Sequence, residues 1–166
     1  MDRWKQKIAD GQVLFGTHIT DTDMHNAKVL GHCGYDYFWI DMEHTQITKK
    51  DVCNILMAAR AVGPELAAFV RVPVLDPAQV KPILEMGPTG IIFPMIFTEE
   101  DVDMFIMGPC DFSGAYDYEN IRMWIDKGVS MISVGSEPAF MIDGSMTALG
   151  NMRRACEDSR AGNASL

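Results

Sequence analysis

Short apolar runs alternate with amphipathic segments along most of this chain. The apolar runs are typical of strands, and they lie at residues 13–19, 35–40, 67–72, 90–96, 102–107 and 129–134. Segments with apolar residues at helical spacing predict helices, at residues 21–31, 50–63, 76–86 and 145–158. Strands of continuous apolar character that alternate with helices indicate a parallel sheet covered by helices.

The ends of the helical segments carry suitable residues. Gly31 and Gly63 end the first two segments, and glycine commonly follows the last turn of a helix. Asp76 and Pro77 open the third segment, since an aspartate caps free backbone N–H groups and proline fits the first turn. These signals support the division of the chain into strands and helices.

Two architectures combine a parallel sheet with covering helices: an open doubly wound sheet and a (β/α)8 barrel. The sequence has neither the GxGxxG dinucleotide fingerprint nor the phosphate-binding GxxxxGK[ST] motif, which weakens the doubly wound interpretation. A closed barrel needs eight strands and about 250 residues. This chain has fewer apolar runs than eight and only 166 residues, so the barrel interpretation must explain the shortfall.

Composition narrows the classes of function. The 166 residues are 48% hydrophobic, so we expect a single domain over residues 1–166. A net charge of −9, from 14 basic and 23 acidic residues, argues against nucleic-acid and membrane partners but leaves room for a small anionic substrate. No apolar run is long enough to predict a membrane span, and the amino terminus lacks the apolar core of a signal peptide. The four cysteines lack paired spacing, which is typical of free thiols in a cytoplasmic protein.

Polar residues gather just beyond the carboxyl ends of three apolar runs. Asp41, Glu43 and His44 follow the second run. Arg71 ends the third, and Asp111 follows the fifth in a Gly-Pro-Cys-Asp turn. In parallel α/β proteins that edge of the sheet is where ligands bind. An arginine, a histidine and two or three carboxylates that meet there could bind a divalent cation, hold an anionic substrate and move a proton.

Structural roles compete with these functional ones. Asp41 could cap the turn that follows it, and Asp111 could be a plain turn residue. Glu43 is better interpreted as a solvated loop charge, and a lone histidine such as His44 is more often structural than catalytic. Arg71 differs, because a guanidinium within an apolar strand is hard to explain as surface and needs a paired anion when buried. The residues alone therefore predict a parallel α/β enzyme with a candidate metal site.

Several segments resemble the HpcH/HpaI aldolase family. Residues 34–44, GYDYFWIDMEH, are similar to the family signature G-[FY]-D-x-x-x-x-D-x-E-H. Further matching segments follow in the family's order: VRVP at 70–73, ILEMG at 83–87, IIFP at 91–94, GPCDFS at 108–113 and GVSMISVG at 128–135. Together they cover nearly the whole chain, and the combination of D-x-E-H with GPxD[LF]S is specific.

The resemblance implies a (β/α)8 TIM barrel and a class II aldolase. Such an enzyme cleaves a 4-hydroxy-2-oxo acid to pyruvate and an aldehyde, with Mg2+, Mn2+ or Co2+ as the Lewis acid. His44 matches the family's catalytic base. Arg71 matches the arginine that steadies the substrate's oxo group and the developing negative charge.

The resemblance also assigns roles to four other positions and to the assembly. Asp111 matches a metal-ligand carboxylate, and Gly108 and Pro109 of the same turn are expected to bind substrate. Glu85 stands where the family usually has an aspartate that pairs with the catalytic histidine, often across a subunit contact. Since the relatives are homo-oligomers, we expect a homo-oligomer here.

Two parts of the family pattern have no counterpart in this sequence. They are the strand with an I-E-T-like glutamate metal ligand and the Y-P-P-x-G-x-R-G segment. The pattern jumps between Glu99 and Asp103 and again between Tyr116 and Asn120. Loss of core strands would open a barrel and expose sheet edges. We therefore expect that two internal segments are absent from this chain, and that consecutive Cα atoms in each window lie farther apart than the usual ~3.8 Å.

Other functions fit the same residues. One is a genuinely shortened and inactive relative. A second is a citryl- or malyl-CoA lyase of the same superfamily, which would need a route for the CoA moiety. A third is a binding protein that keeps the pocket without turnover. An assay of pyruvate release combined with metal titration separates these from the aldolase.

Overall fold

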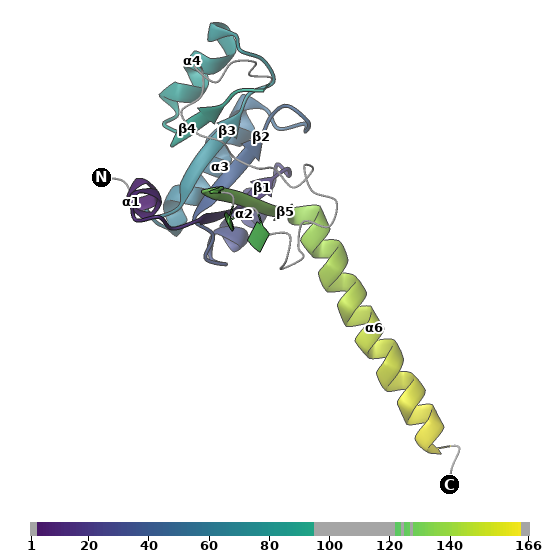
Figure 1. Ribbon diagram of the computed structural model, residues 1–166. Helices are drawn as coiled ribbons and strands as arrows, with labels where there is room; N and C mark the ends of the chain where they lie inside the picture. The colour runs from purple at the N-terminus through teal and green to yellow at the C-terminus, as the bar shows by residue number, and fades with distance from the viewer. Residues whose placement is uncertain (1–2, 95–121, 124, 127, 164–166) are drawn as a thin grey trace.

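The computed structural model describes residues 3–94, 122–123, 125–126 and 128–163 of the chain. Five strands in this part form one sheet in the order β4-β3-β2-β1-β5, and every pair of neighbours is parallel. Figure 1 shows this sheet with its helices. The strands are β1 (Leu14–Ile19), β2 (Tyr37–Asp41), β3 (Ala67–Arg71), β4 (Gly90–Ile92) and β5 (Met131–Ser136). The parallel sheet expected from the sequence is confirmed.

Three helices return the chain from one strand to the next, which makes the amino-terminal part a series of β/α units. They are α2 (Met24–Gly31), α3 (Lys49–Val62) and α4 (Pro77–Glu85). The expected caps are confirmed, because Asp76 accepts a hydrogen bond from the Ala78 N–H of α4 and Gly63 follows the last turn of α3. In addition, Thr48 and Asp51 form a reciprocal capping box at the start of α3.

The two outer helices differ from the sequence-based expectation. No helix was predicted near the amino terminus, yet α1 (Arg3–Ala9) forms there. The last helix was expected at residues 145–158, but α6 (Glu137–Asn163) begins directly after β5 and extends away from the sheet (Figure 1). The early start suits the sequence Glu137-Pro138, because proline is tolerated in the first turn of a helix and an acidic residue there complements the helix dipole.

The sheet is buried on both faces, which explains the continuous apolar character of its strands. The helix-covered face packs Phe38 and Ile40 of β2 and Val70 of β3 against α2, α3 and α4. The opposite face holds Tyr37, Trp39 and Phe69, with α1 packed against them through Trp4 and Ile8; Leu14, Ala67 and Met131 complete this second cluster. Alternate residues of β2 therefore belong to different clusters, as the pleat of a strand requires.

Close packing on the second face depends on a glycine in β1. Gly16 is the register partner of Tyr37, and a Cβ atom at Gly16 would lie 2.3 Å from the Tyr37 ring. No side chain fits at that distance, so glycine lets the tyrosine ring cross β1. This packing fixes the register of β1 and β2, which in turn sets the level at which the two strands end.

Several sequence-based expectations fall on residues that the structure does not describe. These are the strand at 102–107, the turn with Gly108, Pro109 and Asp111, and the two windows at 99–103 and 116–120. Within the described part the sheet is an open arc, with β4 at one edge and β5 at the other. None of the helices in that part combines the length and the apolar character needed to cross a membrane.

Candidate active site

An arginine and an aspartate meet at the carboxyl ends of β2 and β3. Asp41 and Arg71 are register partners, the last residues of their strands. Arg71 donates two hydrogen bonds to the carboxylate, from Nε to Oδ1 at 3.0 Å and from Nη2 to Oδ2 at 2.6 Å. Both side chains are largely buried, with 18% of Arg71 and 5% of Asp41 exposed. From the sequence we expected a buried Arg71 to pair with an anion. The structure shows that this anion is Asp41.

Asp41 also shapes the loop after β2. Its Oδ1 accepts hydrogen bonds from the backbone N–H groups of Glu43 at 2.9 Å and His44 at 3.2 Å. Burial by itself would raise the pKa of Asp41, but the hydrogen bonds and charge of Arg71 and the two backbone donors hold the pKa below its ordinary value. Asp41 therefore stays ionised, and it caps the turn after β2, as expected from the sequence, while it also anchors Arg71.

Glu43 and His44 lie on the same loop, beside the guanidinium. The Glu43 Oε2 atom is 3.2 Å from Arg71 Nη1 and 3.7 Å from His44 Nε2. The interpretation of Glu43 as a solvated loop charge is wrong, because only 19% of its side chain is exposed and it pairs with Arg71. His44 is 67% exposed and is thus the most solvent-accessible of these side chains. The structure thus brings together Asp41, Glu43, His44 and Arg71.

The remaining predicted site residues are not part of this cluster as described. Glu85 is exposed at the carboxyl end of α4 and, among the described residues, shares no hydrogen bond or ion pair with His44. Asp111, Gly108 and Pro109 lie outside the described part. In that part no three His, Cys, Asp or Glu side chains form a group that could hold a metal ion. The described residues therefore do not form a metal site by themselves.

A further carboxylate at this edge was not predicted. Glu137 follows β5, is 4% exposed, and accepts hydrogen bonds from the backbone N–H and the hydroxyl of Thr20 at 3.0 Å. The N–H of Asp21 donates a weaker one at 3.4 Å. Burial raises the pKa of Glu137, and the bonds from Thr20 offset only part of that rise. The signal available in the sequence was a glutamate directly after the Gly135-Ser136 end of a strand, which lies in the structure beside the end of β1.

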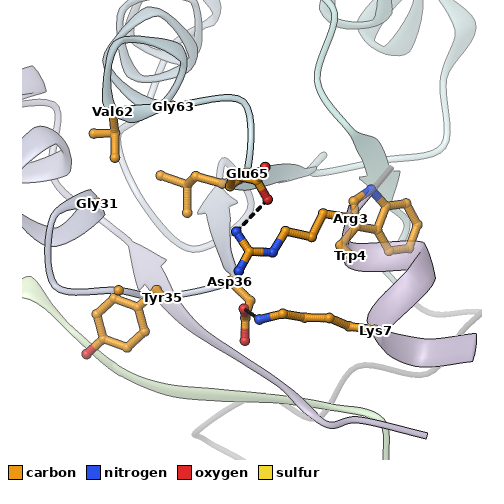
Figure 2. Close-up of a pocket in the computed structure, with 11 residues that line it drawn as sticks. Arg3, Trp4, Lys7, Gly31, Tyr35, Asp36, Val62, Gly63 and Glu65 are labelled. Carbon is orange, nitrogen blue, oxygen red and sulfur yellow. Dashed lines mark hydrogen bonds and ion pairs between the residues drawn. The ribbon is translucent and has the colours of Figure 1, made fainter. Parts of the chain in front are cut away.

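A separate cavity lies at the amino ends of the strands, away from this cluster. It has a volume of about 290 Å³ and is lined mainly by α1, the turn before β2 and the segment between α3 and β3. Figure 2 shows that Arg3 and Lys7 reach from α1 across it. Arg3 pairs with Glu65 at 2.7 Å, and Lys7 pairs with Asp36, whose other oxygen accepts the N–H of Phe15. Arg3 and Lys7, which line this cavity, therefore pair with carboxylates and hold α1 to the sheet.

A parallel sheet of β/α units with a cluster of ionisable residues at its carboxyl edge places the protein among the α/β proteins that bind ligands at that edge, which include barrels and open sheets. The sequence profile of the HpcH/HpaI aldolase/citrate lyase family matches residues 15–137. The chain belongs to this family.

Relatives and solved structures agree with this assignment. The chain is 27% identical over 144 residues to a 2-dehydro-3,6-dideoxy-6-sulfogluconate aldolase of Pseudomonas putida, covering 82% of this chain and 55% of that protein. It is 32% identical over 97 residues to a hydroxypyruvate/pyruvate aldolase of Paraburkholderia phytofirmans, covering 58% of this chain and 37% of that protein. The chain thus spans about half the length, or less, of these relatives.

Solved structures match the fold over most of this chain. An HpcH/HpaI aldolase/citrate lyase family protein of Burkholderia cenocepacia superimposes with a TM-score of 0.79 at 19% identity, covering 92% of this chain and 100% of that one. The citrate synthase SbnG gives 0.78 at 16% identity, covering 92% and 98%. The TIM-barrel fold expected from the sequence is confirmed, and the described sheet is an arc of that barrel.

Proposed function

We propose that the protein is a carbon–carbon lyase that cleaves a 4-hydroxy-2-oxo acid to pyruvate and an aldehyde. The observation that carries the proposal is the Arg71 guanidinium, held at the sheet's carboxyl edge by the two hydrogen bonds that it donates to Asp41. A fixed cation at that place suits a reaction in which negative charge develops on an oxo group. Family membership and the aldolase names of the relatives support the same class of reaction.

The proposed step moves one proton and breaks one bond. His44 takes the proton of the substrate's 4-hydroxyl, directly or through water, and the C3–C4 bond breaks as the aldehyde carbonyl forms. The electron pair of that bond passes into the enolate of pyruvate, which Arg71 stabilises until C3 is protonated. Glu43 lies beside this base, with its Oε2 atom 3.7 Å from the His44 Nε2.

A divalent metal ion is part of the proposal, with Asp111 as the ligand. Bound there, Mg2+, Mn2+ or Co2+ would supply a Lewis acid for the oxo and carboxylate oxygens of the substrate. Asp41 is a poor candidate for a second ligand, since both of its oxygens are engaged by Arg71. We also propose that residues 1–166 belong to one domain. The two internal segments that are expected to be absent from this chain would complete its barrel and its metal site.

The first test is pyruvate release with and without metal. We expect protein treated with a chelator to lose pyruvate formation from 4-hydroxy-2-oxo acids, and to recover it with Mg2+, Mn2+ or Co2+. A lactate dehydrogenase-coupled assay measures the rate. Full activity after rigorous metal removal, or a lysine adduct trapped by borohydride, would instead indicate Schiff-base chemistry. Pyruvate release only from a CoA ester would favour the CoA lyase alternative, and metal binding without turnover would favour a binding protein.

The second test concerns His44. We expect His44→Ala to lower kcat by roughly 100-fold or more, because the substrate hydroxyl then lacks its general base. The exposed His25 of α2 provides a matched control, and His25→Ala should leave kcat unchanged. Near-normal turnover by His44→Ala would remove His44 from the mechanism.

We further propose that the protein is a homo-oligomer in the cytoplasm. The helix α6 supports the first part, because Met141, Ile142, Met146, Leu149 and Met152 are all at least 44% exposed along its length. An exposed apolar stripe of this kind marks a contact surface. The exposed end of α4 also leaves Glu85 accessible to the His44 of another copy. The free thiols of Cys33 and Cys53 fit a reducing compartment.

The apolar stripe allows a direct test of self-association. We expect light scattering to give a mass of at least two chains, and the double variant Ile142→Glu, Leu149→Glu to shift it toward one chain, because two charges cannot be buried unpaired. Thr147→Glu adds a charge on the other side of α6 and should leave the mass unchanged. A wild-type protein of one-chain mass at every concentration would contradict the proposed assembly.

A further inference from the structure

The Arg71 guanidinium has a neighbour besides the two carboxylates. Its Cζ lies 5.2 Å from the ring centroid of Trp39, over the indole. Trp39 is a β2 residue on the same face as Asp41, and its register partner on β3 is Phe69, two residues before Arg71. Only 6% of Trp39 is exposed, so the contact between cation and ring is shielded from water. A shielded cation–π contact is considerably stronger than one at the surface.

The indole is itself held in place from the other side. His18 of β1 is the register partner of Trp39, and the two rings meet edge to face with centroids 4.6 Å apart and an interplanar angle of 73°. His18 is 8% exposed. Trp39 is therefore enclosed by side chains of β1 and β3, and its ring cannot turn away from Arg71 without repacking the interior of the sheet.

These contacts restrain the guanidinium in two different ways. Asp41 engages Nε and Nη2 from the side, and Glu43 lies against Nη1, which fixes the edges of the group within its plane. The indole lies beneath the Cζ atom of the group and limits its movement toward the interior of the sheet. Asp41 uses two of the five N–H donors of the guanidinium. The place from which the other donors reach out is therefore set by the carboxylates and the indole together.

We propose that Trp39 is a positioning residue for Arg71, which holds the guanidinium in the place from which its remaining N–H donors reach the substrate's oxo group. This inference rests on the proposed function of Arg71. Trp39 acts through Arg71 and does not touch the reacting atoms. Its loss should therefore affect the stabilisation of developing charge, and so kcat, more than it affects substrate binding.

The kinetic test replaces the indole while keeping the site apolar. We expect Trp39→Leu to lower kcat by about 10- to 30-fold, which is the expected effect of losing a shielded cation–π contact, with a much smaller change in KM. Trp39→Phe keeps an aromatic face and should recover most of the lost kcat. Equal kcat in Trp39→Leu and wild type, or no recovery in Trp39→Phe relative to Trp39→Leu, would overturn the positioning role.

The matched control is Trp4 of α1. Trp4 also packs edge to face on Phe69, with centroids 5.5 Å apart, and carries its own cation, Lys5, at 5.2 Å. It belongs to the cavity at the amino ends of the strands. Trp4→Leu should lower the melting temperature and leave kcat unchanged, which separates general loss of packing from loss of position. A fall in kcat equal to that of Trp39→Leu would overturn the proposal.

A second measurement is independent of turnover. In a double-mutant cycle, Trp39→Leu and Arg71→Met are combined, and the midpoint of urea unfolding is compared with that of each single variant. If the ring and the cation interact, the combined shift is smaller than the sum of the separate shifts. Additive shifts in an active protein would overturn the positioning role. If the shifts are coupled but the wild-type protein has no lyase activity, the proposed function is overturned and the contact between Trp39 and Arg71 is not.

Discussion

Replacement of Arg71 by lysine is expected to lower kcat by about 100- to 1,000-fold, the range found when one preorganised donor to a developing oxyanion is removed. Lysine keeps the positive charge but not the planar fork. It cannot donate the two parallel hydrogen bonds that Nε and Nη2 of Arg71 give to Asp41, so the ammonium is no longer fixed beside the substrate. Steady-state kinetics of pyruvate release measure the effect.

Arg60 provides the control for this substitution. It lies on α3 and donates to the backbone carbonyls of Met86 and Gly87, so it too uses a guanidinium for more than one hydrogen bond, but outside the site. Arg60→Lys should change stability without changing kcat. If Arg71→Lys retained normal turnover while Arg60→Lys behaved as expected, the stabilising role proposed for Arg71 would be refuted.

The largest effect on stability is expected for Asp41→Ala. The substitution leaves a guanidinium that is only 18% exposed with Glu43 as its remaining anion, and breaking a buried ion pair costs about 3–5 kcal/mol. It also removes the acceptor of two backbone N–H groups in the loop that carries His44. Urea unfolding at neutral pH measures the change in free energy. Glu65→Ala, which breaks the exposed pair with Arg3, should cost no more than about 1 kcal/mol.

The effect of Asp41→Ala on the free energy of unfolding is expected to depend on pH. Because the pKa of Asp41 is lowered in the folded protein, its contribution to stability is present above the unfolded value, about 3.9, and is lost as the pH falls through the folded value. The difference in unfolding free energy between wild type and Asp41→Ala should therefore shrink in acid. A difference that stays constant from pH 7 to below pH 3 would show that the carboxylate charge does not matter.

The sequence predicted the elements that depend on local signals. Continuous apolar runs gave the strands of the described sheet, and caps such as Asp76 and Gly63 gave the limits of two helices. The end of β2 was placed one residue early, because Asp41 is polar and its pairing with Arg71 on the next strand cannot be read from its neighbours in sequence. The short helix α1 was missed for a similar reason, since its burial depends on the contact of Trp4 with Phe69, far away in the chain.

The part of the candidate site that could be predicted is the pairing of Arg71, because a buried charge needs a partner of opposite charge. A guanidinium in an apolar strand must have an anion, and this requirement led from Arg71 to the carboxylates after β2. The position of Glu43 could not be predicted, because a loop charge is solvated or paired according to what the fold places beside it. The contact of Trp39 with Arg71 depends on the register of β2 and β3, which no local pattern specifies.

The pairing of β1 with β5 has a consequence for how the chain folds. Trp39 meets its β3 partner Phe69 only 30 positions later, whereas Leu14 meets Met131 of β5 across 117 positions. Closing the longer loop costs roughly 1 kcal/mol more entropy, since each doubling of length adds about 0.6 kcal/mol. During synthesis β1 to β4 can pair while β5 is still being made, so the seam between β1 and β5 closes last. Amide hydrogens along this seam should exchange with solvent sooner than those between β2 and β3.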